Sequence, residues 1–408
     1  MRRFLTVVLA AATTVAAACT GEDPDLAAAT PDASTADTSA PSVPDASTTD
    51  AGAEAGFDAG CDATLATDPK NCGSCGRDCG QGAECKAGVC QPALLASKLS
   101  APVSIAVNDQ AFFVLNAGSG VGADSANVVS CPVTGCGTAP NIVVQGFDTA
   151  KYAPGPRMIH ATTTDFYWVY RNSFSDHSIG RCNAAGCPNR QPPQTPFYYG
   201  QGEWLGQLYG TTSHLVFVQR NSAVLRTPIP VPAVAGVGYL FTDSGVEFAM
   251  DDEFVYSADR SNAVDYGGLF RCPVGGCASS ADVVKLLPST THVEVANKVL
   301  YATLEKSKRL VACDRLGCGG LGTTLATSPS TILAVAADDV GVYFLTKVEA
   351  GDPGSVFMCK LPDCKGGPVA LATGVGAGES IAVRNGFVYW VDRGTADPPT
   401  GTVHRVRR

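Results

Sequence analysis

An aromatic residue recurs at a nearly regular spacing through most of this 408-residue chain, and this repeat limits the possible folds more than any other feature. Successive aromatics lie 54, 50, 39, 45, 42 and 46 residues apart. Each stands in a short apolar run typical of a β-strand, such as FVYSA or FVYWV. A period in the forties is typical of repeats that each contribute one four-stranded sheet. The seven residues are Phe113, Tyr167, Phe217, Tyr256, Tyr301, Tyr343 and Tyr389.

A second column of positions lies seven residues before the aromatics, and most of its members are small. The residues on either side of these positions are mostly apolar. This pattern suits the first, innermost strand of each repeat, because crowding near a common axis leaves little room for side chains. The column consists of Ala106, His160, Gly210, Ala249, Glu294, Ala336 and Ala382.

Five of the seven repeats also carry two cysteines in a C-x4-C spacing at the end of the third predicted strand. The residues between them include Gly or Pro, so we expect a turn between two strands that a disulfide clips together. Even numbers of regularly spaced cysteines favour disulfides, and hence an exported protein. The pairs are Cys131/Cys136, Cys182/Cys187, Cys272/Cys277, Cys313/Cys318 and Cys359/Cys364.

The last repeat provides three strands, and the segment before the first repeat provides a candidate for the fourth. Residues 92–97 (PALLAS) resemble 368–373 (PVALAT), which is the fourth predicted strand of the sixth repeat. We therefore expect the N-terminal strand to complete the last sheet and to remove the open sheet edges. The predicted fold is all-β: a seven-bladed β-propeller over residues 91–408, closed by this strand. A pair of β-sandwiches or a solenoid fits the repeated columns less well.

The N-terminus has the pattern of an export signal. Arg2 and Arg3 precede an apolar run that is short for a bilayer span and ends in VAAAC. This resembles a bacterial lipobox, which implies a signal peptide over residues 1–18 and acylation of Cys19. The alternative is an ordinary secretory signal. Thr20 follows the cysteine, which by analogy with known lipoproteins implies an outer-membrane anchor in the cell envelope.

Residues 19–60 consist mostly of Ala, Asp, Ser, Thr and Pro, with nine acids and no Lys or Arg. Such a segment cannot bury enough apolar surface to offset its chain entropy, so we expect a disordered acidic linker. The whole chain has a formal charge of −9, but residues 61–408 carry only about −2. Since the folded part has no basic excess, nucleic acid is an unsuitable partner.

Residues 61–90 hold six cysteines in a segment too poor in apolar residues to form a core. The segment resembles the small disulfide-rich module that precedes propellers in many bacterial lipoproteins. Zinc is the alternative, because Cys72 and Cys75 have ligand spacing. Six cysteines allow 15 pairings, and the sequence does not choose between them. The cysteines are Cys61, Cys72, Cys75, Cys79, Cys85 and Cys90.

The runs FYWVY at 166–170 and FVYWVD at 387–392 resemble degenerate YWTD motifs of lipoprotein-receptor propellers. Those propellers usually have six blades, and their Thr-Asp pair is mostly missing here. The resemblance implies the fold and protein binding, but it transfers no ligand. No nucleophile-elbow, zincin, phosphate-loop or dinucleotide motif is present.

Four ionisable residues could form a polar cluster in the central channel. His160 and Glu294 replace small residues in the inner column, and His292 and Glu247 lie two positions before that column, on the same strand face. Two imidazoles with two carboxylates could hold a divalent cation or exchange protons. The alternative is that they line a wet channel without further function, and then no cofactor is expected.

The sequence leaves three functions open. We favour a membrane-tethered monomer that binds a protein or glycan ligand, or acts as a scaffold, through its propeller loops; Tyr198, Tyr199 and Trp204 are a candidate sugar or peptide contact. The first alternative is a propeller enzyme, such as a metal-assisted lyase or hydrolase with the His/Glu cluster in its channel. The second is a structural envelope component that spaces its partners.

Overall fold

The computed structural model divides the chain into two units, residues 1–57 and residues 58–408, and the second contains all the elements described below. The signal peptide, Cys19, the acidic linker and Cys61 lie outside the described residues. The described ranges are 65–118, 126–147, 158–171, 177–192, 198–200, 205–211, 214–219, 223–228, 238–241, 247–259, 268–277, 284–288, 290–304, 308–349, 352–394 and 400–408.

Seven four-stranded antiparallel sheets account for most of the part of the chain that the structure describes. The first sheet contains β4 (Pro102–Val107), β5 (Ala111–Asn116), β6 (Ala126–Pro132) and β7 (Asn141–Phe147). The second contains β8 (Ile159–Ala161), β9 (Asp165–Arg171), β10 (His177–Asn183) and β11 (Tyr198–Gly200). The third contains β12 (Leu205–Gly210), β13 (His214–Gln219), β14 (Ala223–Pro228) and β15 (Gly238–Phe241).

The remaining sheets follow the same order along the chain until the last. The fourth contains β16 (Glu247–Met250), β17 (Phe254–Asp259), β18 (Gly268–Pro273) and β19 (Val284–Pro288). The fifth contains β20 (Val293–Ala296), β21 (Val299–Leu304), β22 (Arg309–Asp314) and β23 (Thr323–Thr327). The sixth contains β24 (Ile332–Ala337), β25 (Gly341–Thr346), β28 (Ser355–Lys360) and β29 (Val369–Thr373). The seventh contains β30 (Gly378–Arg384), β31 (Phe387–Asp392), β32 (Thr400–Arg407) and β3 (Ala93–Ser100).

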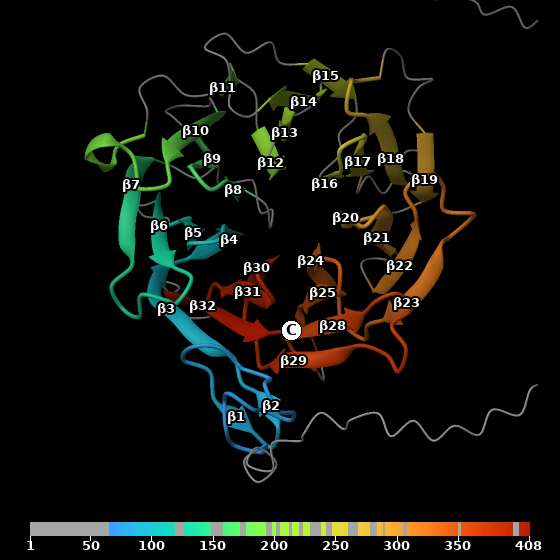
Figure 1. The fold of residues 1–408 in the computed structure, drawn as a ribbon. Helices are drawn as coiled ribbons and strands as arrows, with labels where there is room; N and C mark the ends of the chain where they lie inside the picture. The colour runs from blue at the N-terminus through green and yellow to red at the C-terminus, as the bar shows by residue number, and fades with distance from the viewer. Residues whose placement is uncertain are drawn as a thin grey trace, which may run out of the picture. The chain divides into compact units, whose positions relative to one another are not determined.

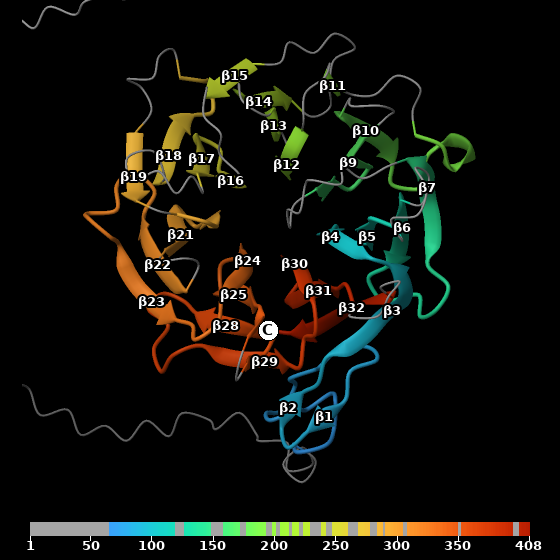
Figure 2. The same cartoon turned by 180° about the vertical axis from the view of Figure 1, so that it is seen from behind.

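These sheets stand around a common centre, with the first strand of each nearest the axis (Figures 1 and 2). The inner strands contact one another in a closed cycle, β4, β8, β12, β16, β20, β24, β30 and back to β4. This arrangement is a β-propeller. It confirms the all-β propeller prediction, and both repeated columns lie where the sequence predicts. The inner column lies on the first strands, and the aromatic column lies buried on the second strands.

The aromatic column forms the core between neighbouring sheets, because alternate residues of a strand point to opposite faces of its sheet. Tyr167, Tyr256 and Tyr343 are fully buried. Between the first and second sheets, the rings of Phe113 and Phe166 stack with their centroids 5.0 Å apart. Apolar burial of this kind is the main favourable contribution to folding.

The seventh sheet combines strands from both ends of the domain. β3 pairs antiparallel with β32, with Leu94 opposite His404 and Ala96 opposite Val403. Leu95 is 2% exposed and its neighbour Leu94 is 55% exposed, so one side of β3 packs into the core. The predicted closure by the N-terminal strand is therefore confirmed.

The five C-x4-C pairs form disulfides, as predicted. Each joins the third strand of a sheet to the turn that follows it; for example, Cys131 lies near the end of β6 and Cys136 lies in the turn before β7. The loop at Cys136 also touches the closing strand, because the Cys136 amide donates a hydrogen bond of 2.8 Å to the Leu95 carbonyl. The other bonds are Cys182–Cys187, Cys272–Cys277, Cys313–Cys318 and Cys359–Cys364.

The cysteine-rich segment contains the short hairpin β1 (Cys85–Lys86) and β2 (Val89–Cys90). Its disulfides include Cys72–Cys85 and Cys79–Cys90. Cys75 is also disulfide-bonded. Since Cys72 and Cys75 are both oxidised, the alternative of a zinc site at this pair is wrong.

The cysteine-rich segment packs against the seventh sheet. The Arg405 guanidinium, on β32, donates hydrogen bonds of 2.8 Å to the Gln81 carbonyl and 2.5 Å to the Val133 carbonyl. The same guanidinium lies over the Phe387 ring, 4.7 Å from its centroid. Gly80 lies so close to Phe387 that a β-carbon there would collide with the ring. One arginine thus connects this segment, the last sheet and the first sheet.

Two further hairpin strands, β26 (Val348–Glu349) and β27 (Asp352–Pro353), and the 3-10 helix η2 (Pro188–Arg190) complete the described elements. The described residues include no helix long and apolar enough to cross a membrane.

The closure makes a prediction about two adjacent leucines. Leu95→Glu should lower the free energy of unfolding by about 3 kcal/mol or more, because it buries an unpaired carboxylate between the sheets. Leu94→Glu, on the exposed side of the same strand, should change it by less than about 0.5 kcal/mol. Urea denaturation of both variants provides the measurement. Equal effects would contradict the pairing of β3 in the last sheet.

Candidate functional site

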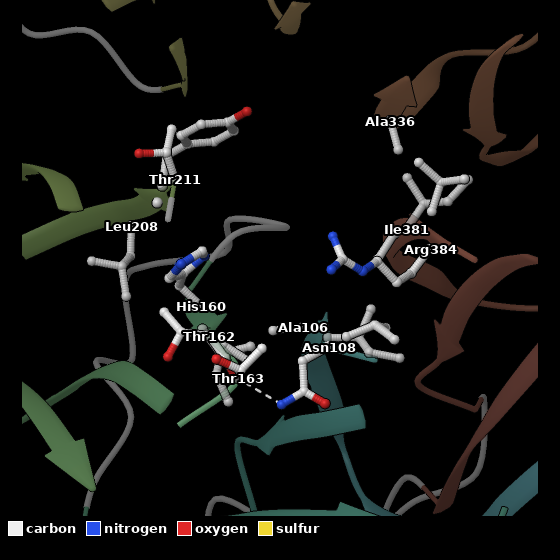
Figure 3. Close-up of a pocket in the computed structure, with 18 of the residues that line it drawn as sticks. Ala106, Asn108, His160, Thr162, Thr163, Leu208, Thr211, Ala336, Ile381 and Arg384 are labelled. Atoms are coloured by element: carbon white, nitrogen blue, oxygen red, sulfur yellow. Dashed lines mark hydrogen bonds between the residues drawn. The ribbon is translucent and has the colours of Figure 1, made fainter. Parts of the chain in front are cut away.

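A pocket of about 570 Å³ opens on the central channel, at the end where the first strands turn into the second strands. Its walls come from β4, β8, β12, β20, β24 and β30 and from the turns after β4, β8 and β12 (Figure 3). Apolar residues, such as Ala106, Leu208, Ala336 and Ile381, make up slightly more than half of the wall, and polar residues make up the rest. Pockets of this size are typical of small-molecule sites.

Short polar side chains shape the mouth of the pocket. Asn108 Oδ1 accepts hydrogen bonds from the amides of Gln110 and Ala111, and Thr162 Oγ1 accepts from the amide of Asp165. The side-chain amide of Asn108 also donates a hydrogen bond of 2.8 Å to the Thr162 carbonyl. This bond joins the first sheet to the second. These side chains replace backbone partners in tight turns and so fix the position of the mouth.

The same kind of turn, in which a side-chain oxygen accepts hydrogen bonds from backbone amides, recurs in other sheets. Asp251 accepts from the amides of Glu253 and Phe254, and Asp338 accepts from the amides of Val340 and Gly341. The sequence analysis overlooked this column, which lies five residues before the aromatic in four repeats. An Asn, Asp or Thr at the same distance from these four aromatics was the signal available to find it.

His160 lies on the pocket wall, where its imidazole packs against Gly210 of the neighbouring inner strand. A β-carbon at position 210 would collide with the ring, so glycine is required opposite the histidine. The Nε2 atom of His160 is buried, and no described residue hydrogen-bonds to it. Burial lowers the pKa of His160 to about 4, although a hydrogen bond with the Thr211 backbone acts in the opposite direction. The imidazole is therefore neutral at pH 7.

Glu294 also lines the pocket and is 8% exposed. The Tyr209 hydroxyl on β12 donates a hydrogen bond of 3.1 Å to Glu294 Oε1 on β20. β16 lies between these strands in the ring, yet none of its residues lines the pocket. The Tyr209–Glu294 contact therefore bridges two sheets that are not neighbours and covers β16 on this side.

Glu247 and His292 pair with each other away from the pocket. His292 Nδ1 and Glu247 Oε2 are 2.5 Å apart, and both residues are buried. Neither residue lines the pocket. The four residues proposed as one channel cluster therefore divide into a buried pair between the fourth and fifth sheets and two residues on the pocket wall. The pair lies at the start of β16 and just before β20, further from the mouth than His160 and Glu294.

Arg384 provides a positive charge on the wall opposite His160. It ends β30, and its guanidinium extends into the pocket (Figure 3). Its Nε donates a hydrogen bond of 2.8 Å to Asp109, which holds the pKa of that carboxyl below its usual value. The pair is about half exposed, so its attraction adds little stability. Sequence analysis overlooked Arg384, because the sequence does not show that the end of β30 faces the channel.

A metal centre would need several ligands in reach of one ion. Among the described residues, the one group with such spacing is Cys72, Cys79 and Cys90, and all three are in disulfides. His160 and Glu294 form no such group. The side chains of Tyr198 and Tyr199, and all of Trp204, lie outside what the structure describes. The arrangement therefore offers a pocket of mixed polarity with a neutral imidazole, the carboxylates of Asp165 and Glu294, and a guanidinium.

No protein-family model and no curated protein matches this chain. Solved propeller structures match it at low similarity. PorZ, a bacterial surface component of the type-IX secretion system of Porphyromonas gingivalis, is 9% identical with a TM-score of 0.46; the match covers 73% of this chain and 36% of PorZ. BamB from Moraxella catarrhalis is 10% identical with a TM-score of 0.42, covering 74% and 82% of the two chains. The CRINKLY WD40 ectodomain of Arabidopsis thaliana ACR4 is 12% identical with a TM-score of 0.41, covering 73% and 92%.

These similarities are too low to indicate a function. This chain spans about a third of the length of PorZ, and all three TM-scores lie below 0.5. Any functional conclusion must therefore come from the pocket itself. The number of disulfides independently indicates an exported protein, since such bonds persist in oxidising compartments.

The buried imidazole predicts a stability that depends on pH. The pKa of His160 is about 4 in the folded protein and 6.5 when unperturbed, so the unfolded chain takes up its proton first as the pH falls. The free energy of unfolding should therefore decrease between about pH 6.5 and pH 4, by up to roughly 3 kcal/mol. Urea titrations across this interval should show a clearly weaker decrease in His160→Phe. An identical pH dependence in both proteins would rule out a buried neutral imidazole.

Proposed function

We propose that this protein is a membrane-tethered envelope lipoprotein whose seven-bladed propeller is a binding module. The pocket at the end of the channel is its ligand site. The observation that carries this proposal is the pocket of about 570 Å³, whose wall combines apolar and polar residues in similar measure and includes the charged side chains of Asp165, Glu294 and Arg384. Apolar walls contribute affinity, and a few fixed polar groups contribute orientation and specificity.

Binding is favoured over the metal-assisted lyase or hydrolase because of where the acid–base candidates lie. Glu247 and His292 are buried against each other, so neither reaches a ligand in the pocket. His160 is neutral at pH 7, and its Nε2 atom is covered. A general base must lie within hydrogen-bond reach of the proton that it removes. The polar groups on the wall are better suited to hold a ligand than to transform one.

The tether rests on the sequence features before the domain. The lipobox-like VAAAC would place an acyl anchor on Cys19, and residues 20–60 would separate the anchor from the domain by an extended acidic chain. The disulfide clips suit an oxidising envelope. By analogy with known lipoproteins, Thr20 favours the outer membrane. Together these features describe a receptor-like propeller held near a lipid surface.

Filling the pocket tests the binding function. A library of amino acids, short peptides, sugars and nucleotides is screened by ligand-observed NMR, and at least one class should bind. Ala336→Trp adds a large side chain to the inner wall and should abolish that binding. Val369→Trp, at a site 63% exposed on β29, is the matched control and should retain it. Absence of any ligand, or binding that survives in the filled pocket, would overturn the proposal.

The anchor is tested separately, by fractionation of cells that express the full chain. Wild type should enter the membrane fraction and incorporate radiolabelled palmitate. Cys19→Ser should lose the label and leave the membrane fraction, because no acyl chain remains to hold it. Cys131→Ser serves as the control for loss of a cysteine and should keep the label. Palmitate incorporation in Cys19→Ser would disprove the assignment of this residue.

A further inference from the structure

The pocket carries opposite charges on different walls, with apolar residues between them. Glu294 contributes a carboxylate from β20, and Arg384 contributes a guanidinium from β30. The carboxylate of Asp165 also lines the pocket, but it is already paired with Arg181 at 3.2 Å. The intervening wall of β24 consists of Val335, Ala336 and Ala337. A guanidinium is always charged in proteins, and the hydrogen bond of Arg384 to Asp109 uses its Nε, so its terminal N–H groups favour a negatively charged ligand group. A group beside the Glu294 carboxylate gains from positive charge.

The two charges stand at different depths. Glu294 lies seven residues before the aromatic of its repeat, and Arg384 lies five residues before its own aromatic, Tyr389. Inner strands of a propeller run in the same direction, so equivalent positions lie at one level. Two residues of a strand correspond to about 7 Å, and Arg384 is the nearer to the mouth. Burial agrees with this order, because Glu294 is 8% exposed whereas the Arg384 side chain is 47% exposed.

A ligand that satisfies both charges therefore has a cationic group at the deep end and an anionic group at the mouth. The difference in depth alone, about 7 Å, exceeds the distance between the ammonium and carboxylate of a single α-amino acid. An extended chain advances about 3.3–3.6 Å per residue, so two or three residues span the gap. The hydroxyl of Thr163, an exposed residue of the pocket mouth, is available to the same anionic end.

We propose that the pocket binds a short apolar peptide of two or three residues. Its N-terminal ammonium lies at Glu294, and its C-terminal carboxylate lies at Arg384. This inference rests on the proposed binding function and specifies its ligand class. The apolar side chains of the peptide pack on the walls formed by β4, β24 and β30, and the two charged ends set its direction.

Isothermal titration calorimetry of the full chain, purified in detergent, tests the charge requirement with chemical probes. The probe is alanyl-leucyl-alanine, compared with its N-acetyl form, its C-terminal amide and free alanine. Removing either terminal charge should weaken binding at least about tenfold, and free alanine should bind more weakly still. These comparisons use the wild-type protein, so they do not depend on the folding of a variant. Equal affinity for the free, acetylated and amidated peptides would overturn the inference.

Two variants assign each charge to its end of the peptide. Glu294→Gln should lower the affinity for the free peptide at least about tenfold, but should change the affinity for the N-acetyl form less than about twofold. Arg384→Gln should likewise weaken binding of the free peptide at least about tenfold, but should change the affinity for the C-terminal amide less than about twofold. Arg393→Gln is the matched control, because Arg393 pairs with Glu379 at 3.7 Å and does not line the pocket. Losses that are the same for modified and unmodified peptides would contradict the assignment.

Failure of this inference can be told apart from failure of the binding function. Suppose that the tripeptide shows no binding, while a library ligand binds to the wild type and no longer binds to Ala336→Trp. The peptide inference is then wrong, and the pocket remains a ligand site. If neither the tripeptide nor any library member binds, both are wrong. Tight binding of the tripeptide that Ala336→Trp abolishes supports both.

Discussion

Closure of the ring by hydrogen bonds between β3 and β32 is the interaction on which the rest of the structure depends. A sheet edge left open exposes unpaired backbone groups, and in a ring one open edge would also leave the neighbouring sheets without lateral support. The closing strand satisfies that edge, and Arg405 ties it to both the cysteine-rich segment and the first sheet. The inner strands are thereby held around one axis. The pocket exists because they cannot spread apart.

Much of this architecture could be predicted from the sequence, because it depends on local periodicity. The aromatic column, the small inner column and the cysteine spacing each report one strand position, and similarity between the segments at 92–97 and 368–373 identified the closing strand. The site could be predicted less well. A period of two gives the face of a strand but not its neighbours, so His160, Glu294, Glu247 and His292 looked equivalent. The four residues differ in their depth along the strands. Glu247 and His292 lie two positions before the inner column, and they pack between sheets instead of entering the pocket.

The polar groups of the pocket depend on contacts between repeats that no single repeat encodes. His160 fits because the next repeat has glycine at position 210, and Glu294 is held by a tyrosine two sheets away. Arg384 faces the channel only because β30 ends where it does. His160 and Glu294 interrupt the column of small inner residues, and Arg384 stands where several other repeats have Asn, Asp or Thr. Residues that break a repeat in this way are where a propeller acquires an individual function, while the repeat itself maintains the fold.

The five clips have a consequence for how the chain reaches its folded state after export. Each links cysteines five positions apart, so the correct partner is at high local concentration as soon as its turn forms. Oxidation of one blade does not require any other blade to have folded. A chain that emerges from a translocon in sequence can therefore oxidise its blades one after another with little mispairing. The last folding step is then a purely conformational one, in which the two ends of the domain come together and β3 pairs with β32.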